Sequence, residues 1–228
     1  MLRKMTVAII PARGGSKGIP NKNIIHFCGR PLIAWSILQA KKTKKIDSVY
    51  VTSDSDKILQ VAEKYGAVKI KRPAEISGDK ATSESAIIHA LSTVGLENIR
   101  TVVMMQATSP LREPHDLDRA ISQFELESLD SMFSGAVLED FLIWQKKGKS
   151  YQSFNYDYKN RGRRQDRIPQ YVENGSFYIF KPEVILKGSR LGGKIGVYLM
   201  DFWQTFEIDD VEGLQLCKEI FKSKKIKI

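Results

Sequence analysis

Glycine and basic residues concentrate in one short segment near the N-terminus. Residues 11–23 have the sequence PARGGSKGIPNKN, with three glycines and the cations Arg13, Lys17 and Lys22. Glycines let the backbone curl so that N–H groups can point at an anion, and the cations add positive charge. The spacing is neither that of a Walker A loop nor Gly-x-Gly-x-x-Gly. The segment, which we call the glycine loop, therefore predicts a polyphosphate site; the weaker alternative is a Gly/Pro turn with solvated charges.

A group of acidic residues lies near the C-terminus, in the sequence FEIDD at 206–210, which we call the acid segment. Side chains two apart on an extended segment point the same way, so Glu207 and Asp209 could share one Mg²⁺ or another divalent cation. Triphosphate chemistry needs such a hard cation. The alternative is that Asp209 or Asp210 caps the helix expected from Val211. Both can hold, one for each aspartate.

Three other loops carry polar residues suited to ligand binding. Arg72 precedes a proline, Gln106 directly follows an apolar run, and residues 161–167 hold four arginines around Gln165. A guanidinium can bind a carboxylate with two parallel hydrogen bonds, and we select Arg164 for this role from its spacing to Gln165. A solvated basic loop explains most of the other arginines. The alternatives for Arg72 and Gln106 are a capping or solvated arginine and a turn-capping amide.

These loops must be positioned by alternating strands and helices. Apolar, β-branched runs predict strands at 6–10, 48–52, 67–70, 101–105, 130–137, 175–180 and 195–200. Three- and four-residue apolar spacing predicts helices at 31–40, 56–65, 83–91, 117–125 and 211–221. The alternation indicates an α/β fold with a mostly parallel central sheet and flanking helices. Loops starting at Pro11, Ser53, Arg72 and Gln106 should then share the carboxyl edge of the sheet, where such folds bind ligands.

The stretch 138–170 breaks this alternation. It contains a Lys-Lys-Gly-Lys turn at 146–149 and several aromatic residues between 151 and 158. We interpret it as a hairpin arm within a single domain of residues 1–228, and exposed aromatics on such an arm favour a homodimer contact.

Composition narrows the class of protein. A chain of 228 residues with 42% hydrophobic residues can bury one full core, and its net charge of +10 suits nucleic acid or an anionic small substrate. Part of the excess lies in solvated lysines near 41–45 and 222–227. The two cysteines have no metal-ligand spacing and predict free thiols in a reducing cytoplasm, and the first apolar run is too short for a membrane span. We expect no nucleic-acid or membrane partner.

Four segments resemble those of the CMP-sialic acid synthetases (acylneuraminate cytidylyltransferases) and related nonulosonate cytidylyltransferases. They are the glycine loop, RPAE with DKATS at 72–83, QATSPLR at 106–112, and RQD with ENGSFY at 164–178, in the family's order along nearly the whole chain. Two positions depart from the family pattern. Glu207 replaces the first aspartate of an Asp-x-Asp motif, and Val172-Glu173 stands where many relatives carry an arginine.

The resemblance implies a Rossmann-like nucleotidyltransferase fold and assigns roles to residues. The catalytic residues it implies are Arg13, Lys17, Lys22 and Asp209. Nucleotide contacts would come from Ala12, Arg13, Gly14, Asn23, Arg72, Thr82 and Ser83. Contacts to the acceptor sugar would come from Gln106, Arg164, Gln165 and Asn174, and metal ligands from Asp209 and Glu207.

The predicted function is transfer of CMP from CTP to the anomeric hydroxyl of a nine-carbon acid sugar of the sialic type, with release of pyrophosphate. Related acceptors remain alternatives: 3-deoxy-manno-octulosonate, legionaminic acid or pseudaminic acid. A distant alternative of another class is a non-catalytic nucleic-acid-binding α/β protein, which would use the aromatic and basic residues of the arm. That alternative leaves the acidic pair and the glycine loop unexplained.

Overall fold

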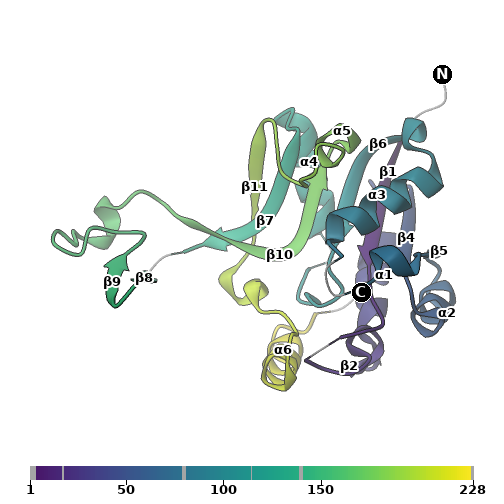
Figure 1. Cartoon of the computed structure of the whole chain (residues 1–228), viewed down its shortest axis with the longest axis horizontal. Helices are drawn as coiled ribbons and strands as arrows, with labels where there is room; N and C mark the ends of the chain where they lie inside the picture. Colours follow the sequence, from purple (N-terminus) through teal and green to yellow (C-terminus); the bar gives the residue numbers. More distant parts are fainter. Residues whose placement is uncertain (1–3, 17, 79–80, 114, 139–140, 227–228) are drawn as a thin grey trace.

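A seven-stranded sheet in the order β11-β7-β10-β6-β1-β4-β5 organises the structure, a computed structural model that describes residues 4–16, 18–78, 81–113, 115–138 and 141–226 (Figure 1). Its strands are β1 (Met5–Pro11), β4 (Ser48–Ser53), β5 (Val68–Lys71), β6 (Ile99–Met105), β7 (Ser131–Val137), β10 (Tyr171–Phe180) and β11 (Ile195–Leu199). β10 runs antiparallel to β6 and β7, whereas the other neighbouring pairs are parallel. The predicted mostly parallel sheet is confirmed.

Helices cover both faces of this sheet because successive strand residues point to opposite sides. Ala8 and Ile10 face a core that includes residues of α1 (Leu32–Lys42), α2 (Asp56–Lys64) and α4 (Asp116–Leu126). Val7 and Ile9 face a second core with α3 (Ser83–Val94) and α5 (Pro182–Ile185). The predicted strands and helices agree with these elements, apart from α5 and the short hairpin described next.

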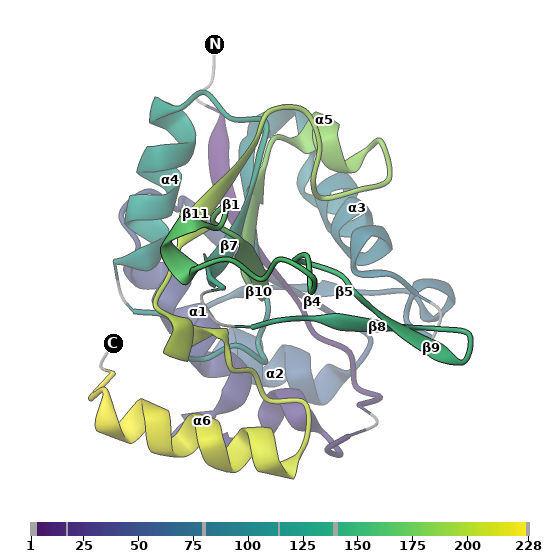
Figure 2. The same ribbon diagram turned by 90° about the vertical axis from the view of Figure 1, so that its left-hand side faces the viewer.

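A third core joins the C-terminal helix α6 (Val211–Ser223) to the hairpin of β2 (His26–Phe27) and β3 (Arg30–Pro31). The ring of Phe221 lies 5.2 Å from that of Phe27 and 4.6 Å from that of Trp35. Figure 2 shows α6 at the end of the molecule below the sheet. This packing brings the acid segment, which precedes α6, beside the glycine loop, which precedes β2.

Among the described residues, five short 3₁₀ helices lie in the connections. They are η1 (Lys22–Ile24), η2 (Ala74–Ile76), η3 (Leu96–Asn98), η4 (Arg164–Asp166) and η5 (Phe202–Thr205). Within the described residues both cysteines are free thiols, as predicted. No helix in the described ranges is long and apolar enough to cross a membrane.

β10 begins at Tyr171, four residues before the predicted start at 175. Its pairing with β7 shifts register between Glu173 and Tyr178, and Gly175 has a φ of +65°. The Asn-Gly-Ser sequence at this bulge is typical of a turn. For that reason the sequence did not predict the part of the strand that precedes Gly175.

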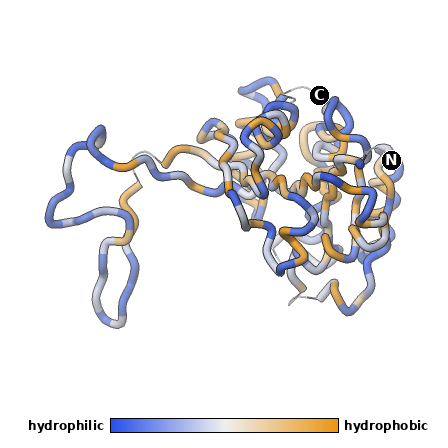
Figure 3. Tube along the Cα trace, turned by 90° about the horizontal axis from the view of Figure 1, so that it is seen from above, coloured by the Kyte–Doolittle hydropathy of each residue, from blue (hydrophilic) through white to orange (hydrophobic). Residues whose placement is uncertain are grey.

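The segment between β7 and β10 forms the predicted hairpin arm, with β8 (Trp144–Lys147) antiparallel to β9 (Ser150–Ser153). The amide of Leu138 donates to the carbonyl of Gln170 at its base, at 2.8 Å. Figure 3 shows the arm extending away from the body with hydrophobic stretches along it. Exposed large apolar side chains on the arm are Phe141, Ile143, Trp144, Tyr151, Phe154, Tyr158 and Ile168.

Candidate active site

An open pocket of about 390 Å³ lies at the carboxyl edge of the sheet, where β1, β4 and β6 end. The predicted residues that line it are Arg13, Lys22, Asn23, Arg72, Thr82, Ser83, Gln106 and Asp209. The loop after β4 also reaches this edge, since Asp54 holds the glycine loop. The four loops that were expected to meet at one edge therefore do so.

The glycine loop is braced by hydrogen bonds from its own backbone. The amide of Ala12 donates to the carbonyl of Thr52 at 3.0 Å, and the amide of Gly14 donates to Asp54 Oδ1 at 2.9 Å. Asn23 Nδ2 donates to the carbonyl of Arg13 at 3.0 Å. The backbone amides of Ala12 and Gly14 already donate to acceptors within the protein. The expectation that they point at the ligand is therefore not met in this structure. The loop instead presents the side chains of Arg13 and Lys22; Lys17 lies outside the described residues.

The glycine loop touches the acid segment at two points. A Cβ built on Gly18 would lie 2.1 Å from the carbonyl oxygen of Asp209, so this close approach requires glycine. Lys22 Nζ lies 2.7 Å from Asp209 Oδ1, with the lysine side chain 13% exposed. The two segments therefore form one wall of the pocket.

The two aspartates of the acid segment have different roles. Asp210 caps α6, because its Oδ1 accepts a hydrogen bond from the amide of Gly213 at 2.7 Å. Asp209 instead lines the pocket. The capping alternative therefore holds for Asp210, and Asp209 is not the cap of α6.

Glu207 lies beside Asp209. The backbone amide of Ile208, between them, donates to the carbonyl of Thr108 at 2.8 Å and pins the segment against the loop after β6. Burial raises the pKa of Glu207, and the nearby Asp209 carboxylate raises it further, while Lys22 opposes the shift. Two neighbouring carboxylates are a suitable donor set for a hard divalent cation.

The chain itself could supply only part of a metal's coordination. Within the described residues, no group of three or more His, Cys, Asp or Glu side chains could hold a metal ion. Mg²⁺ commonly takes one or two carboxylates and completes its shell with phosphate oxygens and water. Glu207 and Asp209 fit this pattern.

Arg72 also lines the pocket and is buried, with 6% of its surface exposed. Its Nη2 donates to the carbonyl of Thr52 at 2.8 Å, while its buried Nε finds no acceptor among the described residues. Burial lowers the pKa of this guanidinium, and Asp54 partly opposes the shift. The alternatives of a solvated or capping arginine are therefore wrong.

The N-terminus of α3 lies beside Arg72. Thr82 Oγ1 accepts a hydrogen bond from the amide of Ser85 at 3.1 Å and so caps the helix, and Ser83 is its first residue. Both line the pocket. The N-terminal end of a helix carries a partial positive charge, which favours electron-rich or anionic ligand groups there.

Gln106 lines the pocket at the end of β6 and lies against the bulge of β10. A Cβ on Gly175 would lie 3.2 Å from Gln106 Nε2, and the amide of Gln106 donates to the carbonyl of Ser176 at 3.2 Å. Asn174 is buried, and its Oδ1 accepts from Ser134 Oγ at 2.6 Å and from the Ser176 amide at 3.1 Å. Asn174 therefore holds the bulge and is not among the described lining residues.

Within one chain, the arm residues do not join this pocket. Gln165 lines a separate pocket of about 220 Å³ at the base of the arm, together with Phe141 and Arg167. Arg163 Nε is paired with Asp166 Oδ2 at 2.8 Å. The backbone of Arg164 lies in η4, while its side chain lies outside the described structure.

Arg112, the last residue of the QATSPLR segment, is not among the described residues that line the pocket. It is fully buried, and it donates to the carbonyls of Gln106 at 3.1 Å and Ser176 at 2.7 Å. Burial lowers its pKa to about 9, and Asp116 partly opposes this shift. Its role is to hold the end of β6 against β10.

Sequence reasoning missed other lining residues, namely Pro11, Ser16, Ala81, Met104, Ala107 and Thr108. Thr108 could have been found, since it follows Gln106 by two positions in the same loop. Met104 could not, because it is one of several apolar residues in a buried strand.

Comparisons with known proteins agree with this geometry. Residues 7–218 match the model of the family described as Cytidylyltransferase. The chain is 40% identical to N-acylneuraminate cytidylyltransferase of Oncorhynchus mykiss over 91% of this chain and 48% of that protein. It is 31% identical to pseudaminic acid cytidylyltransferase of Campylobacter jejuni subsp. jejuni serotype O:23/36 (strain 81-176) over 95% of this chain and 96% of that protein. The chain thus spans about half the length of the first relative.

A solved structure shares the fold. It is a CMP:2-keto-3-deoxy-manno-octonic acid synthetase complexed with CTP, with a TM-score of 0.74 and 15% identity over 97% of this chain and 100% of that chain.

Proposed function

We propose, from the premise that this chain belongs to the Cytidylyltransferase family, that it transfers CMP from CTP to the anomeric hydroxyl of a nonulosonic, sialic-type acid and releases pyrophosphate. The observation that carries the proposal is the composition of one pocket. Its walls combine Arg13 and Lys22, the capped N-terminus of α3 with Arg72, and Asp209 beside Glu207. Phosphates, a base and a cation each find suitable partners there.

In the proposed reaction the anomeric oxygen attacks the α-phosphorus of CTP. A new oxygen–phosphorus bond forms, the bond from the α-phosphorus to the α,β-bridging oxygen breaks, pyrophosphate leaves and the hydroxyl proton is released. Arg13, Lys17 and Lys22 stabilise the charge that accumulates on the leaving group. Mg²⁺ held by Asp209 and Glu207 would supply further positive charge to the triphosphate.

On the nucleotide side, Arg72 and the Thr82–Ser83 end of α3 are proposed to hold the cytosine. The position of Arg72 in the pocket lining, together with the capped N-terminus of α3, supports this role. Asn23 lines the same pocket beside Arg13 and is proposed to contact the ribose or a phosphate.

On the acceptor side, Gln106 is proposed to contact the sugar. Gln165 lines a separate pocket at the base of the arm, which extends away from the body, so the arm does not complete this subsite within one chain (Figure 1). The exposed aromatic side chains of the arm favour packing against a second copy of the chain, which would bring Arg164 to a neighbouring pocket. We therefore propose a homodimer in which each arm completes its partner's acceptor site.

The proposal is tested by incubating the protein with Mg²⁺, each nucleoside triphosphate and a panel of acid sugars, and measuring pyrophosphate release. We expect release with CTP and a sialic-type acid. Release with only 3-deoxy-manno-octulosonate, legionaminic acid or pseudaminic acid would reassign the acceptor. No release with any acid sugar, together with RNA binding that weakens steeply with salt, would favour the nucleic-acid alternative.

A further inference from the structure

Arg190 lies on the loop between α5 and β11 and contacts two elements at once. Its Nε and Nη2 lie 2.8 and 2.7 Å from the same oxygen of Glu84, Oε1. Its guanidinium carbon lies 4.7 Å from the ring centroid of Tyr178. The side chains of Arg190 and Glu84 are only 20% and 21% exposed, so this contact is more shielded from solvent than an ordinary surface ion pair.

Both partners of Arg190 adjoin the pocket. Glu84 is in the first turn of α3, directly after Thr82 and Ser83, which line the pocket. Tyr178 pairs across the sheet with Met104, another lining residue, and its hydroxyl donates to Glu173 on the same strand. Arg190 therefore links the N-terminus of α3, which lines the pocket, to β10, the strand whose bulge contacts Gln106.

The charge of Arg190 matters to an anionic ligand. Burial acts to raise the pKa of Glu84, but the hydrogen bond from Arg190, a backbone hydrogen bond of Glu84 and the charge of Arg190 together outweigh it, and the pKa is lowered. Glu84 is thus a carboxylate one residue from the pocket wall. Without Arg190 its negative charge would be uncompensated beside the wall proposed to hold the cytosine of an anionic nucleotide.

We propose that Arg190 is a positioning residue for cytidylyl transfer. It neutralises Glu84 so that the N-terminus of α3 accepts the nucleotide. It also holds Tyr178, so that the bulge of β10 keeps its position beside Gln106 on the proposed acceptor side. This inference rests on the proposed function and deepens it.

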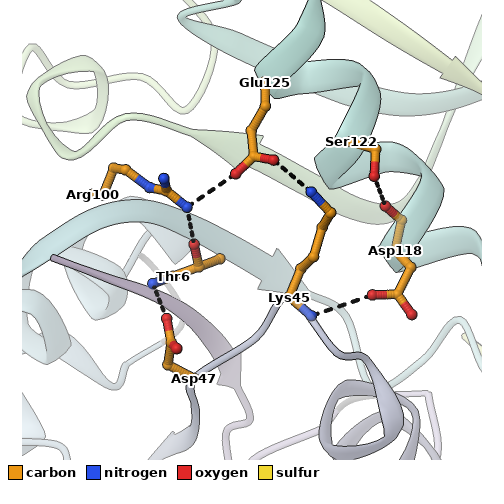
Figure 4. A network of polar contacts seen from close by, with 7 residues as sticks. All are labelled: Thr6, Lys45, Asp47, Arg100, Asp118, Ser122 and Glu125. Carbon is orange, nitrogen blue, oxygen red and sulfur yellow. Dashed lines mark hydrogen bonds and ion pairs between the residues drawn. The ribbon is translucent and has the colours of Figure 1, made fainter. Parts of the chain in front are cut away.

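The test compares Arg190→Gln with a matched control at the opposite edge of the sheet. Arg100 Nη2 lies 3.0 Å from Glu125 Oε1, in a network with Lys45 at the amino ends of the strands, away from the pocket (Figure 4). Losing either ion pair should lower the melting temperature by only a few degrees. Only Arg190→Gln should weaken CTP binding, by about three- to tenfold, and reduce kcat/KM for the acceptor by about tenfold.

Two further variants separate the two parts of the role. Arg190→Lys keeps the positive charge, so CTP affinity should return to within about threefold of wild type. The double variant Glu84→Gln with Arg190→Gln removes the uncompensated carboxylate, so it should regain CTP affinity while acceptor kinetics stay impaired. A residue with a merely structural role would show no such recovery.

The inference is overturned if Arg190→Gln matches Arg100→Gln in CTP affinity and in acceptor KM and kcat. It is also overturned if the double variant binds CTP no better than Arg190→Gln does. CTP affinity is measured by calorimetry without acceptor. A wild-type chain that binds CTP but transfers CMP to no acid sugar would therefore contradict the proposed function, while the CTP affinities would still decide the role of Arg190.

Discussion

Lys22 Nζ lies 2.7 Å from Asp209 Oδ1, although 187 residues separate them in the chain. This contact, and the seating of Gly18 on the carbonyl of Asp209, unite the glycine loop with the acid segment. The cations proposed to bind phosphates and the carboxylates proposed to bind Mg²⁺ are therefore one structural unit. A change in either segment should alter the other.

Replacing Arg13 with alanine should lower turnover by about two or more orders of magnitude, because a charge-assisted contact to the reacting phosphates is lost. Steady-state kinetics with saturating CTP measure this, and an unchanged melting curve shows that the fold survives. Lys22→Ala should behave alike. Near-normal kinetics in a well-folded Arg13→Ala variant would remove Arg13 from the site.

The two neighbouring aspartates offer a paired test of the metal site. Asp209→Asn should raise the Mg²⁺ requirement steeply and abolish most activity, since the amide keeps the shape but loses the charge. Asp210→Asn should be nearly silent, because asparagine caps helices as well as aspartate does. Mg²⁺ titrations of both variants provide the measurement. Equal Mg²⁺ dependence in the two would refute a metal role for Asp209.

Gly18→Ala should reduce activity by about tenfold or more, because the added Cβ would lie 2.1 Å from the Asp209 carbonyl oxygen and must displace the backbone. Gly15→Ala is the matched control, since a Cβ there meets nothing within 4 Å among the described atoms. Both variants are assayed beside their melting curves. Similar activity in the two would mean that the contact of Gly18 with the acid segment is unimportant.

Arg164→Lys keeps the charge but loses the planar fork, so the KM for the acid sugar should rise while that for CTP stays nearly unchanged. Deleting residues 141–158 from the arm should yield monomers that bind CTP but turn over poorly. Sedimentation and kinetics measure both effects. A monomeric, fully active deletion variant would contradict the shared acceptor site, as would an Arg164→Lys variant impaired equally for CTP and sugar.

The fold and the location of the pocket could be predicted because both follow from local patterns. Apolar periodicity set the strands, and the carboxyl-edge rule placed the loops after β1, β4, β5 and β6 together. The order FEIDD could not decide which aspartate caps α6, because that depends on the backbone angle at which the helix begins; the structure assigns the cap to Asp210.

Long-range polar contacts were beyond sequence reasoning. Arg112 stands beside a proline turn like a surface cation, yet tertiary packing buries it among Gln39, Ser176 and Gln106. Asn174 resembles a ligand residue, but it serves the β10 bulge. Arg190 has no local motif, and its position between Glu84 and Tyr178 emerges only once three distant segments are folded together.

The most direct test of the central claim is phosphorus NMR of a reaction containing the protein, CTP, Mg²⁺ and the acid sugar that supports pyrophosphate release. Cytidylyl transfer predicts that pyrophosphate and one phosphodiester resonance of the CMP-sugar appear in equal amounts as CTP disappears. Formation of the CMP phosphomonoester in place of the diester, under conditions in which a CMP-sugar is stable, would show hydrolysis and contradict the account.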